Sequence, residues 1–181
     1  LTIHALRETQ EHELINNRDF GLLHNADYRQ RINTRTGPPT PDDMDQLLCR
    51  RRSTHCFMAH PRTIAALRQE CTRRGFIPET IVFEGSTVAA WRNIPVLPCD
   101  KIPISPQGTS SILAMRLGQE KQGVIGLFRD KLPDEREPGL NVRKMGTNDR
   151  AVGSYLVSTY YSAAVLVPNA LGILENCEIT R

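Results

Sequence analysis

Three residues of the segment HCFMAH, namely His55, Cys56 and His60, have types and spacing that could do chemistry. A thiol four residues from an imidazole could act as a nucleophile with its base, or the two groups could share a metal ion. The sequence has no second Cys/His pair at zinc spacing, and His60 precedes Pro61 at an expected helix start, where N-capping is a sufficient role. The sequence therefore gives little support to a small enzyme that uses Cys56 and His60, and we favour this function least.

Other motifs do not add a reactive centre. The acidic segment DKLPDEREPG lies between prolines and predicts a solvated loop rather than a pair of catalytic carboxylates. Neither GQEKQG nor GLNVRKMG has the glycine spacing that cradles a phosphate. The basic clusters at 50–52 and 73–74 fall where helix ends favour cations. We predict that the chain is not an enzyme and has no catalytic, cofactor-binding or metal-binding residues.

Composition narrows the class of protein. The 181 residues carry a net charge of +3, which implies no strong nucleic-acid or membrane partner. Five cysteines without close pairing favour reduced thiols in a cytoplasmic protein. No apolar run approaches the roughly 18 residues of a membrane span, and no signal peptide opens the chain. Because Leu1 is not an initiator methionine, we expect the true N-terminus to be missing.

The elements that must position any site follow a mixed α+β pattern. Thr40 is an expected N-cap, with Pro41 at the first helical position of a helix that ends near Arg51. A second helix is expected over 61–74, with Gly75 as its stop. After it, short strands follow, including a hairpin about Gly85, one long strand over 154–167 and a closing strand over 175–179.

The front of the chain, up to about residue 37, shows no pattern that could bury a face of its own. The apolar segment FGLL in this stretch would have to be covered by a neighbouring subunit. Three prolines then predict a rigid elbow, because proline fixes its own φ and restricts the residue before it. The elbow consists of Gly37, Pro38, Pro39 and Pro41. An arm without an internal partner indicates a protein that binds copies of itself.

Several long segments carry a family resemblance that runs in order from Asn17 onward. The segments are GLLHNADYRQRINTRTGPPTPDDMDQLL, AHPRTIAALRQECTRRG, WRNIPVLPCDKIPIS, EKQGVIGLF and GLNVRKMGTNDRAVGSYLVSTYYSAAVLVPNALGILENCEI. They resemble the shell proteins of family-two encapsulins, which are bacterial nanocompartments built on the Hong Kong 97 phage capsid-like fold. The segments RRRSTHCF and STYYSAAVLVPNALGILEN look closer to the branch that carries a cyclic-nucleotide-binding domain.

The resemblance implies a division of the chain. Residues 1–37 would form the extended E-loop, 38–56 the spine helix of the peripheral domain, 57–126 the axial domain and 127–181 the return to the peripheral domain. The N-terminal arm and any inserted domain would lie outside this chain. The E-loop would place at the subunit interface Phe20, Leu22, Leu23, Tyr28, Arg29, Arg31 and Ile32.

The implied function is that of a structural subunit of an icosahedral shell in the cytoplasm. The shell would enclose an enzyme cargo, such as a terpene cyclase or cysteine desulfurase, without membrane or nucleic acid. These residues imply no cofactor, and a cyclic nucleotide would bind in a domain outside them. The Pro/Gly/Ser-rich loop 100–111 is the candidate pore loop, with Asp100, Lys101, Ile102, Ser105 and Gln107. The alternative is a phage-type capsid protein that packages DNA.

Overall fold

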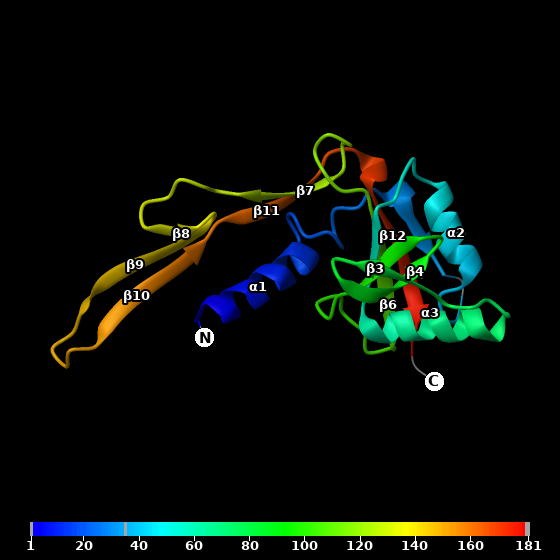
Figure 1. Ribbon diagram of the computed structural model, residues 1–181, viewed down its shortest axis with the longest axis horizontal. Coiled ribbons are helices and arrows are strands. Elements are labelled where there is room, and N and C mark those ends of the chain that lie inside the picture. Colours follow the sequence, from blue (N-terminus) through cyan, green and yellow to red (C-terminus); the bar gives the residue numbers. More distant parts are fainter. Residues whose placement is uncertain (1, 35, 180–181) are drawn as a thin grey trace.

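A seven-stranded sheet forms the centre of the protein in a computed structural model that describes residues 2–34 and 36–179 (Figure 1). The strands lie in the order β1-β12-β6-β2-β5-β4-β3. Their bounds are β1 Arg31–Asn33, β2 Cys56–Ala59, β3 Glu79–Phe83, β4 Ser86–Trp91, β5 Ile94–Pro98, β6 Thr109–Met115 and β12 Leu171–Glu178. Two of the pairings are parallel, β1 with β12 and β2 with β5. This sheet confirms the predicted mixed α+β class.

The central strands are buried on both faces, which explains their nearly continuous apolar sequences. In β6, Ile112 and Ala114 pack in one core, whereas Leu113 and Met115 pack in a second core on the opposite face. The first core lies under the helices α2 (Pro41–Cys49) and α3 (Pro61–Arg73). The sheet is therefore the wall between two hydrophobic cores.

Local signals place both of these helices as predicted. The Thr40 side chain accepts a hydrogen bond from the amide of Asp43, and the Asp43 carboxylate accepts from the amide of Thr40. This reciprocal capping satisfies two backbone donors that a helix start leaves unpaired. Helix α3 begins with Pro61 after the cap His60 and ends before Gly75, which has a φ of 81°.

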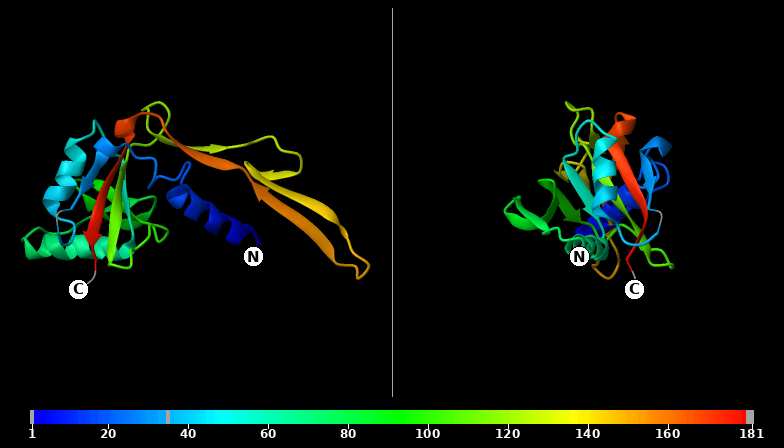
Figure 2. Two further views of the ribbon diagram at one scale, coloured as in Figure 1. Left: turned by 180° about the vertical axis from the view of Figure 1, so that it is seen from behind. Right: turned by 90° about the vertical axis from the view of Figure 1, so that its right-hand side faces the viewer.

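A long arm extends from this body (Figures 1 and 2). Its root is a two-stranded sheet of β7 (Val124–Phe128) and β11 (Tyr161–Val165), and its outer part pairs β8 (Glu135–Glu137), β9 (Leu140–Thr147) and β10 (Gly153–Thr159). The long strand predicted over 154–167 is thus two strands that separate at Tyr160. The prediction that residues 130–139 form a loop is wrong in part, because Glu135–Glu137 form strand β8 and pair with β9.

The described part of residues 1–37 is not extended as expected, and its correspondence to the E-loop stays a prediction. Helix α1 occupies Thr2–Asn16, the 3-10 turn η1 occupies Tyr28–Gln30, and β1 follows directly. Ile15 and Leu22 pack in the second core, on the sheet face opposite α2. The segment therefore finds its partners inside its own subunit. Residues 1 and 35 of this predicted arm lie outside the described residues.

The predicted domain boundary between residues 56 and 57 does not coincide with a boundary between the two hydrophobic cores. Met44 and Leu47 of α2 share the first core with Phe57 and Val96. Strand β12, expected in the returning peripheral part, pairs with β6 in the same sheet. The expected boundary at residue 181 lies outside the described residues. Which units correspond to the axial and peripheral domains stays a prediction.

Candidate assembly surfaces

The arm carries apolar side chains that its own subunit leaves exposed. Tyr155 and Leu156 of β10 are 63% and 50% exposed. Along the arm and its root the exposed large apolar residues are Leu127, Phe128, Met145, Val152, Tyr155, Leu156, Tyr160 and Leu166. Such a surface is suited to burial against another copy of the chain.

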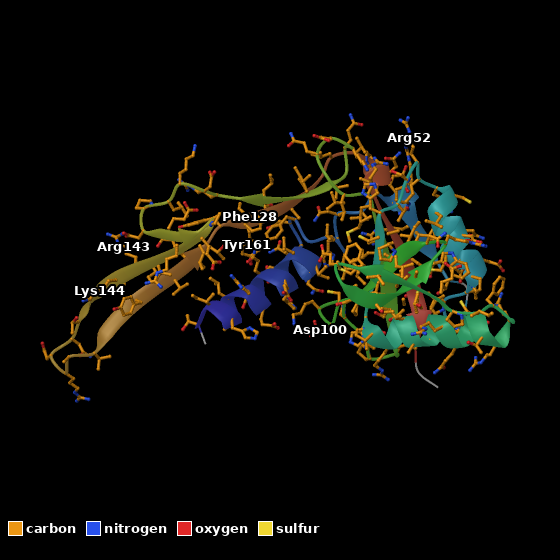
Figure 3. The ribbon with its side chains drawn as sticks, viewed as in Figure 1. Arg52, Asp100, Phe128, Arg143, Lys144 and Tyr161 are labelled. Carbon is orange, nitrogen blue, oxygen red and sulfur yellow. The ribbon has the colours of Figure 1, made fainter. Side chains whose placement is uncertain are left out.

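Cations lie beside these apolar residues on the outer arm. In the β9–β10 pairing, Tyr155 lies opposite Lys144, and Leu156 lies opposite Arg143. Figure 3 shows Arg143 and Lys144 on the arm, far from the central sheet. The guanidinium of Arg129 lies 5.7 Å from the ring centre of Tyr160. The arm thus combines apolar area with positive charge, and its aromatic residues and arginines are of types that are enriched at protein interfaces.

Three hydrogen bonds hold helix α1 against the arm and the body. Arg7 donates to Glu137 of β8 at 2.7 Å, and Lys101 donates to Glu8 at 2.6 Å. The side chain of Asn16 also donates to the carbonyl of Lys101. Exposed ion pairs of this kind contribute little individually, so α1 depends on several weak contacts at once.

Most of the predicted E-loop interface residues make contacts within the subunit. Leu22 and Ile32 are 7% and 6% exposed and pack in the two cores, and Leu23 packs against the second core. Phe20 meets Tyr161 of β11 edge to face. Leu22, Leu23 and Ile32 thus have partners inside the subunit, unlike the residues of an unpartnered arm, and their place at a subunit interface stays a prediction.

The remaining three predicted interface residues differ among themselves. Arg31 pairs with Glu175 at 2.5 Å and donates to the carbonyl of Leu23, so it braces β1 against β12. Tyr28 is 73% exposed, and the Arg29 guanidinium lies 5.3 Å from the centre of its ring. Tyr28 and Arg29 thus remain available to a partner.

The elbow exists, but it joins two parts of the body. Gly37 has a φ of 92°, which glycine adopts without strain, and Pro38 continues the bend toward α2. Pro39 is fully buried, and Pro41 opens α2. The prolines therefore fix α2 against the sheet rather than an arm against the subunit.

The candidate pore loop is anchored to α1 and to the sheet. Lys101 pairs with Glu8 and with Asp100, which raises the pKa of its ammonium group. Ser105 shares a hydrogen bond with Thr109 at 2.7 Å. Ile102 is fully buried in the second core, so its assignment to a pore lining is wrong. Asp100 and Gln107 remain exposed.

The geometry of Cys56 and His60 argues against a thiol enzyme. Cys56 is 2% exposed, and burial raises the pKa of its thiol to about 11, so the reactive thiolate is suppressed. His60 accepts through Nδ1 from the amide of Arg62 and caps α3 as expected. Among residues 2–34 and 36–179, no three His, Cys, Asp or Glu side chains gather as metal ligands. The same residues include no helix long and apolar enough to cross a membrane.

One functional feature escaped the sequence reasoning altogether. Arg51, from the basic cluster 50–52, and Arg116, from neither basic cluster, are 7% and 6% exposed. Arg51 donates to the carbonyl of Ala114, and a Cβ atom at Gly172 would overlap its guanidinium. Arg51 follows α2 and Gly172 lies in β12, so no local sequence pattern indicates that the two residues are in contact.

Known proteins provide a direct comparison with this geometry. The family model described as "Type 2A encapsulin shell protein SrpI-like" matches residues 1–181. The chain is 48% identical over 182 residues to the type 2A encapsulin shell protein SrpI of Synechococcus elongatus, and 42% identical to a type 2A encapsulin shell protein of Mycobacterium leprae. Each comparison covers 100% of this chain and 59% of the relative. The chain thus spans about three fifths of the length of these relatives.

A solved structure extends the similarity to three dimensions. It is the cryoEM structure of the holo-SrpI encapsulin complex from Synechococcus elongatus, which superposes with a TM-score of 0.96 at 48% identity. The match covers 99% of this chain and 64% of that chain. The arm, helix α1 and the body therefore have the arrangement of an encapsulin shell chain, as the predicted capsid-like fold requires.

Proposed function

The chain belongs to the SrpI-like family of type 2A encapsulin shell proteins, and from this premise we propose that its protein assembles with copies of itself into an icosahedral shell around an enzyme cargo. The role is structural, in keeping with the names of the relatives. The single observation that carries the proposal is the 0.96 TM-score to a chain of a holo encapsulin complex.

The arm supplies the physical means of assembly. Its exposed apolar side chains would be buried in contacts between subunits, and every buried Å² of apolar surface contributes roughly 25 cal/mol. In a closed symmetric shell the same contact recurs in every subunit, so a small favourable free energy for each contact adds up over the whole shell. The cargo and the cytoplasmic location are parts of this proposal.

A DNA-packaging capsid is the competing function. A net charge of +3 over 181 residues provides little charge to neutralise phosphates, and DNA binding would weaken steeply with added salt. A cyclic nucleotide bound in a domain outside this chain stays a prediction. So does a pore at the loop 100–111, for which the exposed Gln107 is the residue to vary.

Expression of the full-length protein tests the proposal. We expect closed particles of uniform size by negative-stain electron microscopy, a co-purifying protein by mass spectrometry, and the absorbance spectrum of protein without nucleic acid. Subunits that stay monomeric at high concentration would refute the shell. Particles that carry a strong absorbance at 260 nm, removed by nuclease only after disassembly, would favour the DNA-packaging alternative.

A further inference from the structure

A polar cleft of about 690 Å³ opens at the end of the body where the arm begins. Four segments meet there: η1, the turn after α2, the loop between β6 and β7, and the 3-10 turn η2 (Pro168–Ala170). Figure 3 shows Arg52 at this end of the body. The volume lies within the range of small-molecule sites, roughly 300–1,000 Å³.

Positive charge predominates in the lining of the cleft. Four cations line it, Arg29, Arg52, Arg116 and Lys121, against the two carboxylates of Asp27 and Glu120. Within the described residues, no ion pair joins any of these cations to a carboxylate. The Asp27 carboxylate is already engaged, since it accepts from the amide of Arg29 at 2.8 Å. The lining of the cleft thus has more cations than carboxylates.

Arg116 is the cation of this site whose side chain the protein buries and holds in place. Its side chain is held by Nη2, which donates to Asn169 Oδ1 at 2.8 Å and to the carbonyl of Gln122 at 3.3 Å. Only 6% of Arg116 is exposed, and its buried Nε has no hydrogen-bond partner in the described part of the chain. A buried arginine without an anion is costly, so a bound anion would stabilise this arrangement.

A second buried cation lies beneath the cleft. Arg51 donates to Oε1 of Gln30, a residue of the lining, at 3.2 Å. Burial, together with the charges of Arg50 and Arg116, lowers the pKa of Arg51 to about 10. Burial also lowers the pKa of the nearby His55, and the charges of Lys121 and Arg116 add to this effect. Two separate groups therefore experience the positive potential of the cluster.

We propose that this cleft binds an oxyanion, a phosphate or carboxylate group, through Arg29, Arg52, Arg116 and Lys121. Arginine suits both groups because its planar guanidinium donates two parallel hydrogen bonds to them. The oxyanion belongs either to a free small molecule or to an acidic side chain of a second copy of the chain. The chemistry of recognition is the same in both cases.

Binding of inorganic phosphate to the full-length protein tests the site by equilibrium dialysis. The test variant is Arg52→Gln with Lys121→Gln, because both side chains are exposed and can be neutralised without disturbing a core. The matched control is Arg143→Gln, an exposed cation on the arm. We expect the double variant to bind phosphate roughly tenfold more weakly, and the control to bind like the parent.

The form of the protein distinguishes the two sources of the oxyanion. A site for free anions binds phosphate in assembled particles and in unassembled subunits alike. A site for the carboxylate of a second copy binds phosphate only in unassembled subunits, and the double variant also forms particles in lower yield. The proposal is overturned if phosphate binds neither form, or if the folded double variant binds it as tightly as the parent. Because dialysis of subunits does not require a shell, failure here is separate from failure of assembly.

Discussion

The rings of Phe20 and Tyr161 meet edge to face, with their centroids 6.0 Å apart and their planes at 88°. Phe20 follows helix α1, and Tyr161 begins the strand β11 at the root of the arm. In β11, Tyr161 also lies opposite Phe128 of β7 (Figure 3). The pair therefore joins the front segment of the chain to the base of the arm.

Removal of the Phe20 ring should loosen this joint. An edge-to-face pair contributes about 0.5–1.5 kcal/mol beyond the area that it buries, so Phe20→Ala should lower the free energy of unfolding by at least that amount. Urea unfolding of unassembled subunits measures the effect. Tyr161→Phe keeps the ring and should unfold like the parent, and equal losses in both variants would show that the ring contact is not the cause.

Leu22 tests the corrected role of the front segment. If the front segment were an extended arm, the Leu22→Asp subunit would fold but fail to assemble. In the structure Leu22 is 7% exposed in the second core, so the variant should unfold or aggregate, with a loss above the about 2–5 kcal/mol of a buried Leu→Ala change. Circular dichroism and solubility measure this. Tyr28→Asp puts the same charge on a side chain that is 73% exposed and should stay folded.

Asp45 should make stability depend on pH. The Arg92 side chain and the indole N–H of Trp91 donate to its carboxylate, and together they hold the pKa of Asp45 below its usual value of 3.8. A carboxyl with a lowered folded-state pKa stabilises the fold above its unfolded pKa, and the effect disappears as pH falls through the folded value.

The corresponding variant is Asp45→Asn, studied by urea unfolding at several pH values. It should be less stable than the parent near neutral pH, and the difference should shrink as pH falls below the usual Asp pKa of 3.8. The control Asp149→Asn removes an exposed carboxylate on the arm and should match the parent throughout. A difference between Asp45→Asn and the parent that does not change with pH would contradict the role of the Asp45 charge.

Gly172 should resist even a methyl group. A Cβ atom there would overlap the guanidinium of Arg51, which is buried and bonded to Ala114, so Gly172→Ala should cost about 1–3 kcal/mol. Gly126→Ala is the matched control, because a Cβ atom at Gly126 meets only the ring of Phe128 at 3.7 Å. Thermal unfolding compares the two variants, and equal stability would show that Arg51 can move without cost.

Elements with strong local signals were predictable from the sequence. The capping residues Thr40 and His60, the stop at Gly75 and the hairpin turn at Gly85 act through their immediate neighbours, and each lies where the sequence predicts. The short apolar run of β6 indicates a strand, and the structure shows that this strand is buried on both faces.

Elements that depend on distant residues were not predictable. Helix α1 has one buried residue, Ile15, so no apolar stripe marks it, and its contacts with Lys101 and Glu137 cross most of the chain. The arm was difficult to predict for the same reason. Strands β8 and β9 are mostly polar, so no apolar pattern in the sequence indicates that they pair or in which register. The buried Arg51 lies against Gly172 on a strand more than a hundred residues away.

The central claim is that the exposed apolar side chains of the arm form contacts between subunits in a shell, and Leu156→Asp tests it most directly. Leu156 is 50% exposed, so the change should leave the subunit folded, whereas burial of the new carboxylate at every contact should prevent assembly. The control Leu156→Met keeps an apolar side chain of similar size and should form particles in parental yield. Size-exclusion chromatography with negative-stain microscopy is the measurement. The account predicts folded, unassembled Leu156→Asp subunits, and particles of parental size and yield from that variant would contradict it.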